Sequence, residues 1–271
     1  MTSLSVVVAT YERPQALDAV LFGLSEQSDP HFEVVVADDG SGPETTAVVA
    51  RWQEPFGDRL RHVRQPDEGF RLARVKNLGA REARGDFLAL IDGDAIPRRG
   101  FTAALRASAV DGWFVAGKRL ELDQALSEQV LAERLPVHRW SLARWLRERG
   151  HATPLAALTP RDRRRPGRDG LPEFVPHANR YGVLFGVWRQ DLERANGFDV
   201  RYEGWGEEDI DLAVRLGRLG LRCGWPGPRG TVLHLWHETR KGERPNAALL
   251  AETRTSDRVA AVNGLRALDS P

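Results

Sequence analysis

The sequence predicts an α/β domain built on a doubly wound, mostly parallel sheet with helices on both faces. Three observations support this fold class: short runs of Val, Leu and Ile, amphipathic segments that alternate with them, and acidic clusters where the runs end. Strands that alternate with helices at this spacing form a parallel sheet covered on both faces. The chain has 271 residues, of which 41% are hydrophobic, enough for one large domain.

Four apolar runs near the start are predicted to be the central strands, because buried parallel strands consist of continuous β-branched runs. Helices are expected between them, and Pro14 is placed to open the first one. Gly85 stops the third helix, and the last of these strands leads directly into an acidic motif. The strands are expected at 4–9, 32–37, 60–63 and 87–91, with helices after Pro14, through Val48 and over 72–83.

The second half of the chain is less regular, so we divide one domain into halves at 1–110 and 111–271. The second half is then a C-terminal extension of the sheet. Its expected elements are helices over 119–150, 208–219 and 246–268, a mobile loop over 153–172 that is rich in Pro, Arg and Gly, and a return to regular structure over 181–187.

Composition narrows the class of protein. The formal net charge of +1 gives no sign of nucleic-acid binding, and the single cysteine, Cys223, excludes an intrachain disulfide framework and a four-cysteine zinc site. The first apolar run has no basic segment before it and is too short for a signal peptide or a membrane span. We therefore expect a cytoplasmic protein, and peripheral contact with the inner face of a membrane stays open.

Acidic clusters lie where predicted strands end, and ligands of such sheets bind at the carboxyl ends of the strands. Asp38-Asp39 follows the second strand, and Asp92-Gly93-Asp94 follows the fourth. Two carboxylates separated by a glycine can turn toward one point, and Mn²⁺ or Mg²⁺ favour such oxygen ligands. The alternative is a solvated turn that caps the next helix, for which Asp and Gly are both suited.

Four motifs, in order over residues 3–110, resemble glycosyltransferase family 2. They are Thr10-Tyr11-Glu12-Arg13, Asp38-Asp39-Gly40-Ser41, the basic segment from Arg74 to Gly85, and Asp92-Gly93-Asp94. The resemblance implies a GT-A fold and a UDP-sugar donor, with Asp94 on the metal and Asp92 near the ribose or the metal. The implied donor-binding residues are Thr10, Tyr11, Glu12 (where Asn is commoner), Arg13, Asp39, Arg71, Arg74, Lys76, Asn77, Asp92, Gly93 and Asp94.

The segment from Gly204 to Asp209, Gly-Trp-Gly-Glu-Glu-Asp, resembles the G-W-G-x-E-D segment of β-galactosyltransferases and chondroitin-type polymerases. The resemblance implies that Asp209 is the general base, that Glu208 binds the acceptor beside it, and that Trp205 and Gly206 contact an acceptor sugar. An acceptor hydroxyl needs a carboxylate within hydrogen-bond reach to take its proton. The alternative is that the three acids merely favour the positive end of a helix.

His234 and His237 lie in a segment that resembles the galactosyltransferase M-x-x-H pattern, which is followed by basic residues and by Pro-Asn, here Pro245-Asn246. The resemblance implies that His237 is a metal ligand. His234 occupies the Met position and is a candidate second ligand, because imidazole suits transition metals. Two histidines three residues apart share a side only on a helix or a bent turn, so an ideal strand would separate them.

Together, these motifs predict a metal-dependent inverting hexosyltransferase. Its expected cofactor is Mn²⁺, with Mg²⁺ as the alternative. It would move a hexose or N-acetylhexosamine from a UDP-sugar to a glycan or glycolipid hydroxyl, as in polysaccharide biosynthesis. Residues 1–110 would bind the nucleotide sugar, and 111–271 would bind the acceptor and catalyse transfer. A nucleotidyltransferase acting on sugar phosphates and a catalytically silent sugar-binding module stay open, as do the sugar, the linkage and the oligomeric state.

Arginines cluster at 161–168 and around Trp140 and Trp145. The first cluster is a candidate lid that orders when the donor binds. The tryptophan segment has three interpretations: an acceptor cradle, an interfacial helix that touches anionic lipid, or an ordinary helix with a solvated basic face.

Overall fold

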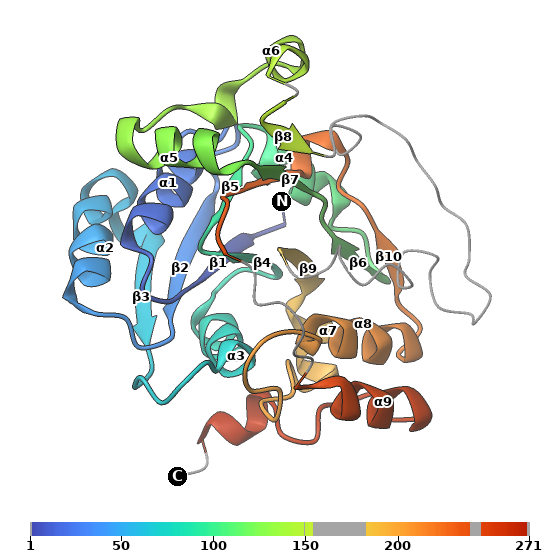
Figure 1. The fold of residues 1–271 in the computed structure, drawn as a ribbon. Coiled ribbons are helices and arrows are strands. Elements are labelled where there is room, and N and C mark those ends of the chain that lie inside the picture. The colour runs from blue at the N-terminus through green and yellow to red at the C-terminus, as the bar shows by residue number, and fades with distance from the viewer. Residues whose placement is uncertain (1, 149, 154–182, 239–244, 270–271) are drawn as a thin grey trace.

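Figure 1 shows the computed structural model, which describes residues 2–148, 150–153, 183–238 and 245–269. Apart from Thr153, the loop expected over 153–172 lies outside the described residues, and so does its arginine cluster. Within the described part of the chain, no helix combines the length and the apolar character that crossing a membrane requires.

Seven strands form the main sheet in the order β10-β6-β9-β4-β1-β2-β3. Neighbouring strands are parallel except at β9, which runs antiparallel to both β4 and β6. The mostly parallel sheet that the sequence predicts is therefore confirmed. The strands are β1 Leu4–Thr10, β2 Phe32–Asp38, β3 Leu60–Arg64, β4 Phe87–Asp92, β6 Trp113–Ala116, β9 Leu184–Trp188 and β10 Arg222–Gly224.

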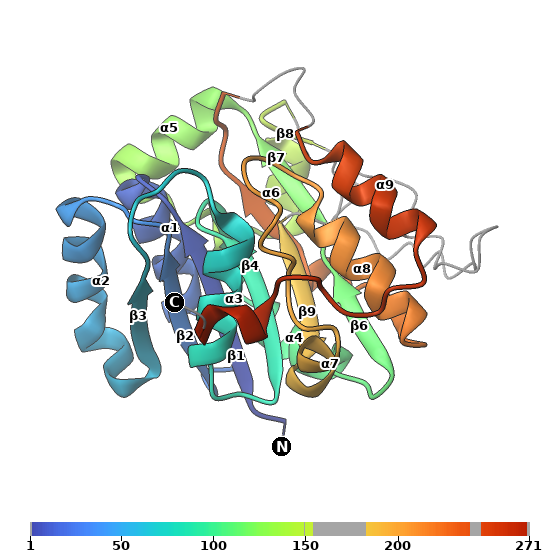
Figure 2. The same ribbon diagram turned by 90° about the horizontal axis from the view of Figure 1, so that it is seen from below.

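The described helices fall into two layers. Those whose buried side chains join the core on one face of the sheet are α1 Pro14–Ser25, α2 Pro43–Phe56, α4 Phe101–Ser108, α5 Gln124–Glu133 and α6 Leu142–Arg147. Those on the other face are α3 Leu72–Glu82, α7 Arg189–Arg194, α8 Glu208–Arg218 and α9 Ala247–Thr255. Figures 1 and 2 show α3, α8 and α9 together on this second side. Short 3₁₀ turns lie at Gly57–Arg59, Val137–Arg139, Pro228–Gly230 and Leu265–Asp269.

Alternate residues of each central strand point to opposite faces of the sheet. In β1, Val6 and Val8 belong to the core under α1 and α2, whereas Val7 and Ala9 belong to the core under α3 and α8. Both sets are buried. Burial on two faces explains why the strands appear in the sequence as continuous apolar runs rather than as an alternating pattern.

A second, smaller sheet joins the two halves of the chain. Its strands are β5 Ala95–Pro97, β11 Val232–His234, β7 Arg119–Leu122 and β8 Ala152–Thr153, in the order β5-β11-β7-β8. Because β5 begins directly after Asp94 and pairs antiparallel with β11, Ala95 lies opposite His234. This pairing brings His234, from the second half of the chain, next to the Asp92-Gly93-Asp94 motif of the first half.

Two of the expected helices are too long. The helix predicted over 119–150 begins with strand β7, in which Leu120 and Leu122 are buried between more exposed neighbours, a period-2 pattern. The helix predicted over 246–268 ends at Thr255, since the chain then extends back to the main domain, where the Ala261 amide donates to the Ala195 carbonyl.

The two tryptophans of the basic segment are core residues. Trp140 and Trp145 are both buried, and their ring centroids lie 4.8 Å apart. The Arg144 guanidinium lies 4.1 Å from the Trp140 ring centroid and is itself exposed. Neither indole is therefore presented to a sugar or a lipid, and the segment is a short helix with a solvated basic face.

Gly79 lets α3 pack tightly on the sheet. A Cβ at this position would lie 2.5 Å from Cγ1 of Val7 and 2.9 Å from the Cβ of Ala37. We expect Gly79→Ala to lower the free energy of unfolding by about 1–3 kcal/mol through overpacking, even though alanine is ordinarily the better helix former. Chemical denaturation measures this change. Gly150→Ala is the control, because its Cβ would meet nothing within 4 Å; equal losses in the two variants would contradict the packing argument.

Candidate active site

Asp94, His234 and His237 converge where β4 and β11 end. Nε2 of His234 lies 3.5 Å from Oδ1 of Asp94, and Nε2 of His237 lies 3.6 Å from Oδ2 of Asp94. One ligand atom from each of the three residues lies within 4.8 Å of the others. Ligands about 2.1 Å from one cation are roughly 3.0–3.5 Å apart, so these side chains fit a shared metal with little movement.

The two histidines share a side because the chain leaves the strand between them. His234 is the last residue of β11, and the Leu235 amide donates to the Asp94 carbonyl at 3.0 Å. The Trp236 amide then donates to Ser127 Oγ at 2.8 Å. The imidazole centroids are 5.2 Å apart as a result. This is the bent arrangement that a regular strand would not allow.

Glu121 is a neighbour of this cluster that sequence reasoning missed. It lies beside His234 in the register of β7 and β11, and its Oε2 is 2.7 Å from Nδ1 of His234. Burial opposes protonation of His234, but the hydrogen bond with Glu121 and the charge of Asp94 outweigh it and raise the pKa of His234. The alternation in β7 is the only signal in the sequence, and it does not reveal the partner strand.

A buried ammonium joins the two halves of the site. Nζ of Lys76, on α3, lies 3.0 Å from Oε1 of Glu208 and 3.8 Å from Oδ1 of Asp92. The sequence resemblance placed Lys76 against a diphosphate, whereas the structure shows it beneath two carboxylates. Burial raises the pKa of Asp92 to about 6. Asp92 thus lies toward Lys76 and outside the group of three residues that could hold a metal.

Glu208 and Asp209 are adjacent buried carboxyls with opposite pKa shifts. Burial opposes ionisation of Glu208, yet the charge of Lys76 outweighs it and lowers the pKa of Glu208. Burial and the neighbouring Glu208 charge together raise the pKa of Asp209 well above its ordinary value. Titratable pairs whose environments push their pKa values apart are typical of acid–base sites.

The Gly-Trp-Gly segment presents one aromatic ring and places these acids. Gly204 has φ +74°, Gly206 has φ +91° and Glu207 has φ +77°, all in the left-handed region that glycine adopts without strain. This sharp path leaves Trp205 56% exposed and puts Glu208 and Asp209 in the first turn of α8. The Asn246 side chain donates to the Gly206 carbonyl at 2.9 Å, so the Pro-Asn motif braces the loop.

Polar residues also gather at the ends of β1 and β2. Asp39 is buried, accepts a hydrogen bond from Gln65 and accepts another from the Arg71 amide at 2.9 Å. Burial raises the pKa of Asp39. Arg74 donates to Gln65 Oε1 at 2.8 Å, which places it in the same network. Asp39, Arg71 and Arg74 therefore lie in one hydrogen-bond network.

The segment after β1 lines the same edge of the sheet. Tyr11 is exposed and its hydroxyl donates to Asp67 at 3.3 Å, while Glu12, at φ +47°, accepts from the Gly42 amide at 2.7 Å. Arg13 turns the other way and donates to Oδ2 of Asp94 at 2.5 Å. The structure thus places Tyr11 and Glu12 near the second strand and Arg13 at the metal cluster.

Two buried polar atoms at this edge have no hydrogen-bond partner among the described residues. They are Oγ1 of Thr10 and Oδ1 of Asp92. A Cβ at Gly93 would lie 3.0 Å from Oγ1 of Thr10, so the glycine allows the close approach. Buried polar atoms are ordinarily satisfied, and those without protein partners mark a place where a ligand can supply the bond.

Asn77 is placed differently from its predicted role. Its side chain is fully buried, accepts from the Phe198 amide and donates to the Phe198 carbonyl, both at 2.8 Å. These two bonds clamp the loop before α8 onto α3. We therefore assign Asn77 a structural role, in which it holds the loop at Phe198, and not a role in donor binding.

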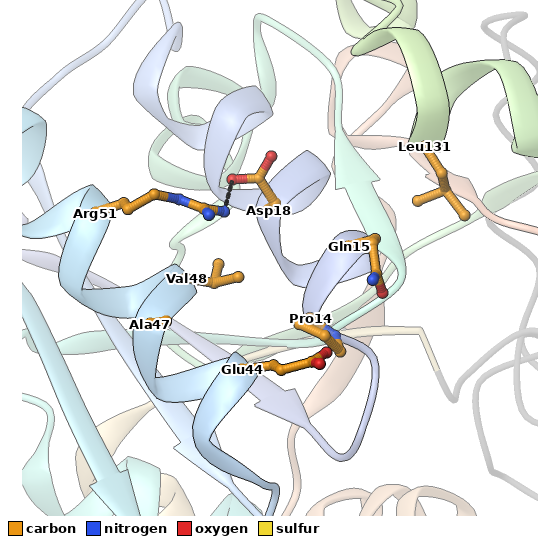
Figure 3. A pocket seen from close by; sticks show the side chains of 8 residues that line it. All are labelled: Pro14, Gln15, Asp18, Glu44, Ala47, Val48, Arg51 and Leu131. Carbon is orange, nitrogen blue, oxygen red and sulfur yellow. Dashed lines mark hydrogen bonds and ion pairs between the residues drawn. The ribbon is translucent and has the colours of Figure 1, made fainter.

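A cavity of about 310 Å³ lies elsewhere, between α1, α2 and α5 (Figure 3). The Asp18 carboxylate on its wall pairs with Arg51 at 3.4 Å. None of the predicted site residues lines this cavity. It is distinct from the site at the strand ends.

Comparison with known proteins agrees with the geometry. Residues 5–158 match the model of glycosyl transferase family 2, and residues 172–238 match that of the N-terminal domain of galactosyltransferase. Chondroitin synthase from Pasteurella multocida is 27% identical over 227 residues, covering 79% of this chain and 23% of the relative. Validoxylamine A glucosyltransferase from Streptomyces hygroscopicus is 30% identical over 232 residues, covering 80% of this chain and 52% of the relative. The chain thus spans about a quarter of the first relative's length and about half of the second's.

Solved structures share the fold. A mannosyltransferase from Pyrobaculum calidifontis, in complex with GDP-Man and Mn²⁺, aligns with a TM-score of 0.57 and 22% identity, over 87% of this chain and 57% of that one. Staphylococcus aureus TarS aligns with a TM-score of 0.63 and 14% identity, over 86% of this chain and 37% of that one. These likenesses confirm the GT-A fold. Since the first family model covers more than half of the sequence, and the expected motifs lie together at the strand ends, the chain belongs to glycosyltransferase family 2.

Proposed function

We propose that this protein is a metal-dependent inverting glycosyltransferase that moves a hexose or N-acetylhexosamine from a UDP-sugar to a hydroxyl of a glycan or glycolipid. The observation that carries the proposal is the junction at Lys76. Its ammonium links Asp92, two residues before Asp94, with Glu208, which precedes Asp209. A candidate metal cluster and a candidate base thus share one edge of the sheet, as a transfer between donor and acceptor requires.

The donor set fits a divalent transition metal. Asp94 offers a carboxylate, and His234 and His237 offer imidazoles. Imidazole favours Mn²⁺ over Mg²⁺, which prefers oxygen ligands, so Mn²⁺ is the proposed cofactor. When bound, the cation would neutralise negative charge on the leaving diphosphate. The Mn²⁺ in the mannosyltransferase of similar fold supports this assignment.

Asp209 is the proposed general base. Its raised pKa gives it a greater affinity for a proton than an ordinary Asp, which suits removal of a proton from an acceptor hydroxyl. Glu208, held ionised by Lys76, would hydrogen-bond the acceptor beside it. Attack by the acceptor on the face opposite the leaving group inverts the anomeric carbon and needs no covalent intermediate. The Asp at 209 favours this outcome, because related retaining enzymes often carry Asn there.

The two halves of the domain would divide the substrates. In residues 1–110, we assign the Asp39 network, Tyr11 and Glu12 to the nucleoside. Oγ1 of Thr10 and Oδ1 of Asp92, which accept no hydrogen bond from the described residues, lie at the same edge. In residues 111–271, the exposed Trp205 ring would stack on an acceptor sugar. A UDP donor follows from the resemblance to β-galactosyltransferases, and GDP-mannose is the alternative that the solved mannosyltransferase raises.

A donor panel with a metal requirement tests the proposed activity. We expect Mn²⁺-dependent release of UDP from one or more of UDP-glucose, UDP-galactose and their N-acetyl forms, with simple sugars as acceptors. Chelation should stop the release, and Asp94→Asn or His237→Ala should slow it by about 100-fold or more. Release of pyrophosphate instead would indicate a nucleotidyltransferase, and donor binding without release would indicate a silent module. Release from GDP-mannose alone would overturn the UDP assignment.

Replacement of the proposed base should separate chemistry from binding. Asp209→Asn should lower kcat by about 10²–10⁴, because the amide cannot accept the proton, while the Kd for UDP stays within about twofold. Steady-state kinetics and calorimetric titration with UDP measure the two effects. Glu203→Gln is the matched control, since this exposed carboxylate lies just before the Gly-Trp-Gly segment and should leave both values unchanged. Normal turnover in Asp209→Asn would rule out Asp209 as the base.

The pH profile should reveal the coupling between the two acids. Asp209 accepts a proton only when ionised, so activity should rise with pH through its raised pKa. The Glu208 charge contributes to that rise in pKa, and its removal in Glu208→Gln should lower the pKa of Asp209. The acid limb of the kcat profile should therefore move to lower pH, even where the maximal kcat falls. A limb that stays in place or moves to higher pH would contradict the pairing.

A further inference from the structure

His234 is held far more firmly than a loop histidine. It ends the central part of the small sheet, where β11 lies between β5 and β7 and its neighbours across the strands are Ala95 and Glu121. Its side chain is 11% exposed. His237, by contrast, lies after the strand and is 39% exposed. Among the described residues, its Nδ1 has the Glu238 carbonyl beside it, at 3.0 Å. The two imidazoles thus differ in how their orientation is set.

We propose that Glu121 is a positioning residue that orients His234 as a metal ligand, so that the site binds Mn²⁺ in preference to Mg²⁺ before any donor arrives. This inference rests on the proposed function, since it concerns the metal that Asp94 and His237 would share. Glu121 belongs to β7, lies outside the sequence motifs of the site, and would act on the metal only through His234.

The hydrogen bond selects one tautomer of His234. Glu121 Oε2 lies 2.7 Å from Nδ1, and a carboxylate accepts, so the proton lies on Nδ1. The lone pair is then on Nε2, the atom that faces Oδ1 of Asp94 at 3.5 Å. A carboxylate that holds the far nitrogen of a ligand histidine fixes the ring and increases the basicity of the ligand nitrogen.

Backbone pairing makes this contact a fixed feature of the fold. Parallel pairing of β7 and β11 puts residues 121 and 234 in register, so both side chains emerge on the same face. Arg119, two residues earlier on that face of β7, forms an ion pair with Oε1 of Glu121 and leaves Oε2 for the histidine. The Glu121 carboxylate is therefore held by Arg119 of its own strand and by His234 of the neighbouring strand.

The consequence for metal choice follows from the ligand types. With His234 oriented, the protein offers two imidazole nitrogens and one carboxylate, a set that suits Mn²⁺ better than Mg²⁺. If His234 turned away, only the Asp94 oxygen and the His237 nitrogen would remain as ligands. This pair would discriminate less between Mn²⁺ and Mg²⁺. Glu121 should thus affect the ratio of the two affinities, in addition to Mn²⁺ affinity itself.

Metal titration of the protein without any nucleotide sugar tests this inference. Loss of the free Mn²⁺ signal in electron paramagnetic resonance gives the Mn²⁺ affinity, and competition gives that of Mg²⁺. We expect Glu121→Gln to weaken Mn²⁺ binding by about 10–100-fold, with a much smaller effect on Mg²⁺. Spin-echo modulation from bound ¹⁴N should fall from two imidazoles toward one. Asp123→Asn is the matched control, because Asp123 pairs with His151 at 2.8 Å in the same segment but outside the site.

The outcomes separate this inference from the proposed function. If Glu121→Gln and His234→Ala keep wild-type Mn²⁺ affinity while Asp94→Asn and His237→Ala lose it, the inference fails and the metal site survives. If all four variants bind like the wild type, the metal site itself fails. If His234→Ala loses affinity but Glu121→Gln does not, His234 is a ligand without need of Glu121, which also overturns the inference. An unchanged thermal unfolding curve for Glu121→Gln confirms that the fold is intact.

Discussion

The site depends on one buried ammonium. A charge removed from water is tolerated only when carboxylates and hydrogen bonds surround it, and Lys76 takes its partners from both halves of the chain, Asp92 at the end of β4 and Glu208 at the start of α8. Loss of either partner would leave the buried charge with only part of its compensation. The geometry that joins the strand ends to the first turn of α8 is therefore coupled to the stability of the core, and the opposite pKa shifts of Glu208 and Asp209 arise from the same contact.

The small sheet makes the second connection. Because β5 continues from the acidic motif and pairs with β11, the distant histidines reach Asp94 through backbone hydrogen bonds and not through a flexible loop alone. The parallel neighbour β7 then adds Glu121 behind His234. Metal ligands placed on strands are positioned more rigidly than ligands on loops, and this rigidity would let the protein choose its cation before the donor binds. Arg13, which also contacts Asp94, would have to share that carboxylate with the metal.

Side chains that packing alone explains lie beside those that carry the proposed chemistry. Asp211 is in the same helical turn as Asp209, yet it is buried against Arg215 at 2.6 Å and Thr253, so its role is structural. Asn77 follows Lys76 but clamps the loop at Phe198. A helix N-terminus rich in acids thus contains both kinds of residue, and only their contacts distinguish them. The positive N-terminal end of α8 still favours negative charge on Glu208, Asp209 and Asp211.

The sequence by itself determined the fold class and the family, because period, turn residues and ordered motifs are local properties of the chain. The four central strands begin where they were predicted, and family membership is confirmed. The sequence did not reveal the contact of Glu121 with His234 or that of Lys76 with Glu208. Each contact joins residues more than a hundred positions apart, and the first also depends on the register of two strands. The extent of two helices was also decided by tertiary structure: β7 is a strand because β11 pairs with it, and α9 stops where the chain returns to the main domain. Burial of Trp140 and Trp145 likewise depended on packing that no local pattern of arginines reveals.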